Sequence, residues 1–246
     1  MNSSYNAGDH DDGDRSAGTI AARLGAVRDQ LVAAQARYGR APGSVRLIAV
    51  SKTKPPAAVR EAYDAGQRAF GENHLQDAMT KVATLDLPDL EWHFIGAVQS
   101  NKTRAVAQHF DWVHTIDRLK TATRLSAQRP AGLAPLNVCI QVNVSGEASK
   151  SGVTAAESAE LAQRVAELAR LKLRGLMAIP APEEDFERQR LAFRVLAEQL
   201  EVLRGQGLAL DTLSMGMTHD MEAAVAEGAT LVRIGTAIFG ARTRLG

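Results

Sequence analysis

Short apolar runs with a two-residue alternation recur along most of the chain, and segments with helical periodicity separate them. The apolar runs predict strands at residues 45–52, 69–73, 91–96, 112–117, 136–144, 172–180, 212–217 and 231–236. Helix-period patterns occupy residues 55–66, 75–85, 101–110, 118–128, 154–170, 186–206 and 220–229. Because strand and helix alternate strictly, the strands are predicted to be parallel and covered by helices.

Eight such units favour a closed α/β barrel of the (β/α)8 (TIM) type over an open doubly wound sheet, which usually has about five or six strands. The open sheet also lacks its usual ligand motif, because the chain contains no GxGxxG or GxxxxGK[ST] loop. Before the first strand, apolar residues recur at helical spacing and predict an extra N-terminal helix. These residues are Ile20, Leu24, Val27 and Leu31.

Composition narrows the class of protein. The chain has 29 basic and 28 acidic residues, a formal net charge of +1, so no overall field favours nucleic acid or an anionic membrane. No apolar stretch is long enough to span a membrane, and the single cysteine, Cys139, excludes an internal disulfide and a multi-cysteine metal site. We expect a cytoplasmic protein, with a disordered polar tail at residues 1–17 and one barrel domain at residues 18–246.

The end of the first predicted strand carries a candidate for covalent chemistry. In a parallel barrel, ligands bind where the strands end, and Lys52 closes the run VRLIAVSK on the same face as Ile48 and Val50. A desolvated lysine loses proton affinity and becomes an amine that forms Schiff bases with carbonyl groups. The spacing alone leaves open the alternative that the Lys52 ammonium ends the strand in solvent. Lys54 is either a second cation on this face or a solvated side chain.

The last predicted strand, LVRIG, carries a second signal. Arg233 shares a face with Gly235, so its guanidinium points into the barrel and needs a partner there. The Gly235 and Thr236 amides and the Ser214 hydroxyl are candidates for phosphate binding, because loops after strands seven and eight form the usual phosphate site of such barrels. A salt-bridged Arg233 followed by a turn glycine is the alternative.

Two further polar residues lie in or at the ends of apolar strands. Glu72, between a glycine and an asparagine, is either a structural anchor or a catalytic acid. His93, between Trp92 and Phe94, is either a pocket contact or a hydrogen-bonded core histidine. The other histidines lack paired metal-ligand spacing, so we expect no metal.

Ordered motifs span the region from Leu47 to Arg242: LIAVSKTKP, AGQRAFGEN, EWHFIGAVQSNK, DWVHTID, QVNVSGEASKSG, RGLMAIP, SMGMTHDMEAA and VRIGTAIFGAR. In these motifs the chain closely resembles the pyridoxal phosphate homeostasis protein family, whose members share the alanine racemase N-terminal barrel. The resemblance implies that Lys52 holds pyridoxal 5′-phosphate (PLP) as an internal aldimine. It also implies that Asn73 lies near the cofactor ring and that Arg233 faces the pyridine nitrogen. The implied phosphate-binding residues are Ser214, Gly235 and Thr236.

The resemblance further implies a carrier and regulator of the cofactor, with a role in vitamin B6 homeostasis and amino and keto acid balance and no established turnover. Apo forms of PLP-dependent enzymes are candidate recipients. The alternative is a fold-type III amino-acid racemase, which needs a second acid or base opposite Lys52, supplied in racemases of this barrel by a tyrosine of an additional domain. None of Tyr5, Tyr38 and Tyr63 closes a strand, and the chain stops at Gly246, so we favour a monomeric carrier.

Two positions need separate comment. Thr218 and His219 stand where the family pattern is Ser-Asp. The change either makes phosphate retention pH-sensitive or alters only a loop surface, and we favour the loop. Lys150, in SGEASKSG, is either a site of transient cofactor transfer or an ordinary surface lysine.

Overall fold

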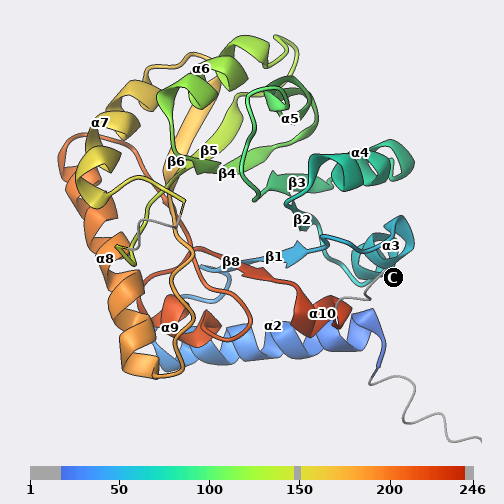
Figure 1. The fold of residues 1–246 in the computed structure, drawn as a ribbon. Helices are drawn as coiled ribbons and strands as arrows, with labels where there is room; N and C mark the ends of the chain where they lie inside the picture. The colour runs from blue at the N-terminus through green and yellow to red at the C-terminus, as the bar shows by residue number, and fades with distance from the viewer. Residues whose placement is uncertain (1–17, 147–150, 242–246) are drawn as a thin grey trace, which may run out of the picture.

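The computed structural model describes residues 18–146 and 151–241, and these form a closed barrel of parallel strands in the order β1 to β8 (Figure 1). A helix follows every strand, so the predicted (β/α)8 barrel is confirmed. The sequence predictions for residues 1–17 and for Lys150 lie outside the described residues.

The strands are β1 (Arg46–Val50), β2 (Ala69–Glu72), β3 (Glu91–Phe94), β4 (Trp112–Ile116), β5 (Leu136–Gln141), β6 (Leu171–Met177), β7 (Thr212–Ser214) and β8 (Leu231–Ile234). The helices are α2 (Ile20–Arg37), α3 (Pro56–Asp64), α4 (Leu75–Thr84), α5 (Thr103–His109), α6 (Leu119–Gln128), α7 (Ala155–Ala166), α8 (Phe186–Gly205), α9 (Met221–Ala226) and α10 (Thr236–Phe239). Each strand ends earlier than predicted, because the last residues of each apolar run belong to the loops at the barrel mouth. Helix α10 was not predicted.

The barrel has two apolar layers. The larger lies between the strands and the helices, and includes Ala49 and Ile234. A smaller cluster drawn from six strands fills the inside of the barrel, and its members are Ile48, Ala69, Trp112, Cys139, Met177 and Leu231. Burial raises the pKa of Cys139 to about 12, so this thiol is neutral and chemically inert. Successive side chains of a strand point to opposite faces. One set therefore packs inside the barrel and the other packs against the helices.

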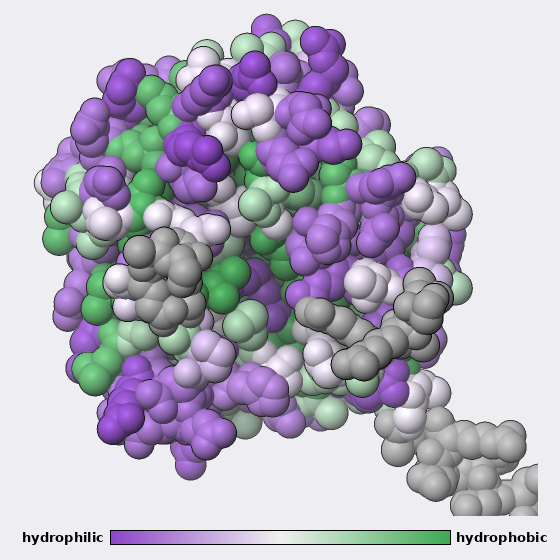
Figure 2. Space-filling model, viewed as in Figure 1, coloured by the Kyte–Doolittle hydropathy of each residue, from purple (hydrophilic) through white to green (hydrophobic). Residues whose placement is uncertain are grey.

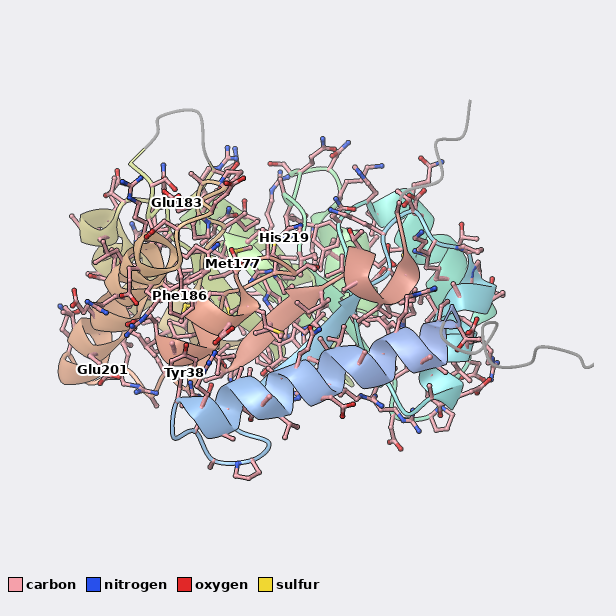
Figure 3. All side chains as sticks on the ribbon, turned by 90° about the horizontal axis from the view of Figure 1, so that it is seen from below. Tyr38, Met177, Glu183, Phe186, Glu201 and His219 are labelled. Atoms are coloured by element: carbon pink, nitrogen blue, oxygen red, sulfur yellow. The ribbon has the colours of Figure 1, made fainter. Side chains whose placement is uncertain are left out.

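Helix α2 lies along the outside of the barrel and packs against α3, α9 and α10 (Figures 1 and 3). The Thr19 side chain caps its first turn by accepting from the Ala22 amide. Farther along, Arg23 Nε donates to the Ile238 carbonyl oxygen at 2.7 Å. The first helix therefore holds the short helix that follows the last strand. Within the described segments, no helix is long and apolar enough to cross a bilayer.

Candidate cofactor site

A pocket of about 320 Å³ lies where the strands end, bordered by the loops after β1, β2, β3, β6, β7 and β8. Its volume falls at the lower end of the range of about 300–1,000 Å³ that is typical of small-molecule sites. The predicted site residues that line it are Lys52, Asn73, Arg233, Gly235 and Thr236. Figure 2 shows the face seen in Figure 1, which is hollowed near its centre and bordered there by both hydrophilic and hydrophobic residues.

The β1 end brings Lys52 to the pocket. Ile48 belongs to the cluster inside the barrel, and Val50 and Lys52 line the pocket above it. This is the shared face that period-two alternation predicted. Lys52 is partly buried, and the chain turns sharply after it, since Thr53 has a φ of 63°. Lys54 also lines the pocket, and its Nζ donates to the Ala241 carbonyl oxygen at 2.9 Å.

A buried polar cluster supports this turn from behind. Ser51 Oγ donates to Glu72 Oε1 at 2.5 Å, and Lys81 Nζ lies 2.6 Å from the same oxygen. Lys81 Nζ also donates to the Ser51 carbonyl oxygen at 2.7 Å. Burial raises the pKa of Glu72, although the charge of Lys81 opposes this shift. Glu72 is therefore the structural anchor and does not line the pocket. No pattern in the sequence indicated Lys81, which comes from the neighbouring helix α4.

Asn73 directly follows β2 and presents an acceptor that lacks a partner. Its Oδ1 is buried without a hydrogen-bond partner among the described residues. A buried amide oxygen of this kind is costly unless a ligand or water donates to it. The loop after β3 approaches closely, because a Cβ on Gly96 would collide with the Asn73 carbonyl oxygen. These backbones therefore form one wall of the pocket.

The β8 side supplies a buried cation. Arg233 NH1 donates to Ser214 Oγ at 2.7 Å, and NH2 donates to the Ala178 carbonyl oxygen at 3.0 Å. Burial lowers the Arg233 pKa to about 10, which still leaves a cation at neutral pH. Within the described residues Arg233 forms no ion pair, so the salt-bridged alternative does not apply to that part of the chain. The structure thus gives the pocket a positive wall.

Ser214 lies below the pocket and does not line it. Its side chain is fully buried, and its oxygen is 2.7 Å from both Arg233 NH1 and His114 Nδ1. The loop after β7 brings Thr218 and His219 to the pocket instead, both exposed, with His219 at the rim (Figure 3). The phosphate role of Ser214 stays a prediction, and Thr218 is a further hydroxyl candidate at the pocket.

Helix α10 begins at the pocket wall. Gly235 and Thr236 form its start, and the first N–H groups of a helix have no partner within the helix. Such amides and a neighbouring hydroxyl are suited to an anionic group. Among the described residues, no cluster of histidine, cysteine, aspartate or glutamate is arranged to hold a metal ion.

Sequence reasoning missed several residues of the pocket. They are Thr53, Ile95, Ile179, Met217 and Phe239. The first four lie in loops just after the strands, where no periodicity describes the course of the chain, and Phe239 ends the short helix α10, which the sequence did not predict. Of the two alternatives for His93, the structure shows the core histidine, fully buried and hydrogen-bonded. Its ring bonds to His114, a pairing that the sequence did not indicate.

Comparison with known proteins places this fold and site. A model of the alanine racemase N-terminal domain matches residues 23–243, so the chain is a barrel of the alanine racemase N-terminal type. The pyridoxal phosphate homeostasis protein of Escherichia coli is 59% identical over 226 residues, which cover 91% of this chain and 97% of that protein. The homologue of the same name from Pseudomonas aeruginosa is 60% identical over 225 residues, 91% of this chain and 96% of that protein. The chain belongs to the pyridoxal phosphate homeostasis protein family, as its motifs predicted.

Solved structures agree. PipY of Synechococcus elongatus without PLP has a TM-score of 0.81 and 42% identity, and covers 90% of this chain and 100% of that one. PipY with PLP bound gives the same TM-score at 40% identity, with coverage of 90% and 100%. An alanine racemase from Corynebacterium glutamicum, at 19% identity and a TM-score of 0.66, shares the fold over 91% of this chain and 63% of that one.

Proposed function

We propose that this chain binds PLP through Lys52, holds it reversibly, and takes part in vitamin B6 homeostasis and amino and keto acid balance without catalytic turnover. The observation that carries the proposal is one pocket lined by Lys52, Asn73 and the buried cation Arg233, together with Gly235 and Thr236. The names of the bacterial relatives and the PLP-bound PipY structure support it.

The pocket residues suit the groups of this cofactor. Bound PLP supplies an aldehyde that condenses with an amine, and an aromatic ring that acts as an electron sink when its nitrogen is protonated. Lys52 is the amine. Gly235 and Thr236 offer amides to the phosphate, with Thr218 nearby on the loop after β7. Arg233 would supply a cation to the ring nitrogen, which would disfavour protonation of that nitrogen and restrain carbanion chemistry.

The racemase alternative needs a second acid or base at the pocket. Neither Tyr38 nor Tyr63 lines the pocket. Tyr38 lies at the end of α2, where its ring stacks on Phe186 and its hydroxyl donates to Glu222 (Figure 3). The Tyr63 hydroxyl donates to the Pro88 carbonyl oxygen. These contacts support the carrier. A monomeric, cytoplasmic protein that delivers PLP to apo-enzymes belongs to the same proposal.

The first experiment locates the cofactor. The purified protein is incubated with PLP, reduced with borohydride and mapped by peptide mass spectrometry. We expect a phosphopyridoxyl group on Lys52, its loss in Lys52→Ala, and its retention in the matched variant Lys54→Ala, because Lys54 Nζ already donates to Ala241. Protein that stays colourless and unmodified with excess PLP contradicts the proposal.

A second experiment separates carrier from catalyst. Racemisation of amino acids is followed by chiral chromatography, and transfer of PLP to an apo-enzyme by recovery of that enzyme's activity. We expect transfer without racemisation. Racemisation that disappears in Lys52→Ala would instead favour the enzyme. Transfer is repeated with Lys150→Ala, and unchanged transfer would exclude Lys150 as a transfer site.

A further inference from the structure

Polar side chains cross the inside of the barrel below the pocket, where aliphatic residues usually dominate. From Arg233 NH1 the bond to Ser214 Oγ measures 2.7 Å, and the next, from Ser214 Oγ to His114 Nδ1, also 2.7 Å. His114 Nε2 then lies 2.9 Å from His93 Nδ1, and His93 Nε2 lies 2.6 Å from Glu91 Oε1. We call these five residues the polar chain. It connects β8 and β7 with β4 and β3, and its three middle members are fully buried.

The chemistry of the groups fixes the direction of each bond. An ionised Glu91 only accepts, so His93 Nε2 donates to it. A neutral His93 then has an acceptor at Nδ1, to which His114 Nε2 donates. His114 Nδ1 is left as an acceptor for the Ser214 hydroxyl proton. The Ser214 oxygen can therefore accept from Arg233, and all four bonds run the same way, from Arg233 to Glu91.

Electrostatics agree with this assignment. Burial lowers the pKa of His93, and burial with the neighbouring His93 and Arg233 lowers the pKa of His114 well below its usual value. Burial acts to raise the pKa of Glu91, but its hydrogen bonds with His93 and Arg46 and the charge of Arg46 act in the opposite direction and lower it, so Glu91 is a carboxylate at neutral pH. The polar chain can have all its hydrogen bonds in one direction only if both histidine rings are neutral and Glu91 is ionised, and these pKa shifts favour those states.

We propose that His114 and His93 are positioning residues for Arg233. His114 accepts the Ser214 proton and so turns the Ser214 oxygen toward Arg233 NH1, while the Ala178 carbonyl oxygen holds NH2. The guanidinium is thereby kept in one orientation at the pocket wall. The inference rests on the proposed function, because its consequence is the affinity and absorption spectrum of bound PLP.

Matched variants separate positioning from packing. His114→Gln keeps an acceptor toward Ser214 and a donor toward His93, whereas His114→Leu has neither and fills a similar volume. Glu91→Ala removes the last acceptor at a partly exposed position, and replaces His114→Leu if that variant does not fold. His109→Gln changes an exposed histidine outside the polar chain and serves as the control.

The first test uses the apo protein and needs no cofactor. Long-range ¹H–¹⁵N correlation spectra report the protonation of each ring, and comparison with the His114→Gln and His93→Gln variants assigns the signals. We expect both rings to be neutral with the proton on Nε2 at neutral pH, since burial lowers the pKa of each. A proton on Nδ1 of either ring, or a doubly protonated ring, overturns the inference.

The second test measures PLP binding by absorbance titration, with near-UV circular dichroism to verify folding. We expect wild type, His109→Gln and His114→Gln to agree within about two-fold in Kd, and folded His114→Leu to bind about ten-fold more weakly with a shifted absorption maximum. If folded His114→Leu has the wild-type Kd and spectrum, the positioning role is overturned but the proposed function is not. Failure of the wild type to bind PLP overturns the proposed function and this inference with it.

Discussion

Lys81 and Glu72 form an ion pair behind the residue that precedes Lys52, with side chains only 3% and 0% exposed. A single Lys81 nitrogen contacts both the Glu72 carboxylate and the Ser51 carbonyl oxygen. The pair therefore joins α4, β2 and the end of β1 at one point. Because both charges are out of water, removing one partner leaves the other uncompensated.

We predict that Lys81→Met lowers the free energy of unfolding by about 3–5 kcal/mol, because it leaves a buried carboxylate unpaired. The double variant Glu72→Gln, Lys81→Met should recover much of this loss, since it buries no charge. Urea denaturation followed by circular dichroism measures both. Lys102→Met, at an exposed position, is the control. Equal losses in the single and double variants would show that the pair is not coupled.

We predict that Gly235→Ala weakens PLP binding several-fold. A Cβ at Gly235 would lie 3.2 Å from the Val50 carbonyl oxygen and 3.3 Å from Val50 Cβ, so the start of α10 or the end of β1 must shift. Absorbance titration measures the Kd. Gly25→Ala in α2 has open space around its Cβ, and should keep the Kd and raise stability by about 0.5–1 kcal/mol. An unchanged Kd in Gly235→Ala would mean that the start of α10 and the end of β1 accommodate the added methyl group without disturbing the PLP site.

We predict that Gly216→Ala destabilises the protein by more than about 1 kcal/mol. Gly216 has a φ of 94°, and a Cβ there would lie 2.6 Å from Ala224 Cβ. Because the loop that it begins carries Thr218, PLP binding should weaken as well. Thermal unfolding and titration measure the two effects. Gly132→Ala, whose Cβ has open space, should change neither, and a harmless Gly216→Ala would show that this turn tolerates a side chain.

We predict that stability falls with acid below about pH 6.5, the usual pKa of an unfolded histidine. The folded pKa values of His93 and His114 are lowered by burial, so these rings favour folding above that pH and lose this contribution as the unfolded chain binds protons. The charged groups that face them are Glu91, Arg46, Asp111 and Arg233. Urea denaturation between pH 7 and pH 5 should show a slope of up to about 2.7 kcal/mol per pH unit for the two rings.

The control for this pH dependence is a variant that removes one titrating ring. His114→Gln should reduce the slope by about half, since one ring contributes about 1.4 kcal/mol per pH unit. His109→Gln replaces an exposed histidine and should leave the slope unchanged. If the pH dependence of the free energy of unfolding is unchanged in His114→Gln, the acid sensitivity belongs to other groups.

Local periodicity was enough to predict the barrel and the direction of its two most informative side chains. Lys52 and Arg233 face the pocket because alternation along a strand depends only on backbone geometry. The position of Ser214 was beyond such reasoning, since it depends on where β7 ends relative to its neighbours and on a bond to His114, 100 residues away in sequence. The Lys81 contact was equally hidden, because no local pattern tells which helix residue reaches a buried strand carboxylate.

The contact between α2 and α10 has a consequence for the newly made chain. Arg23, in the first of the described helices, donates to Ile238, 215 residues later. A ribosome completes α2 early, but β8 and α10 emerge last among the described elements and must then dock on a helix that has long since left the exit tunnel. The wall formed by Gly235 and Thr236 is therefore completed only after the other described elements have been made. A chain that still lacks β8 and α10 also lacks this wall, so it should hold PLP less tightly than the closed barrel.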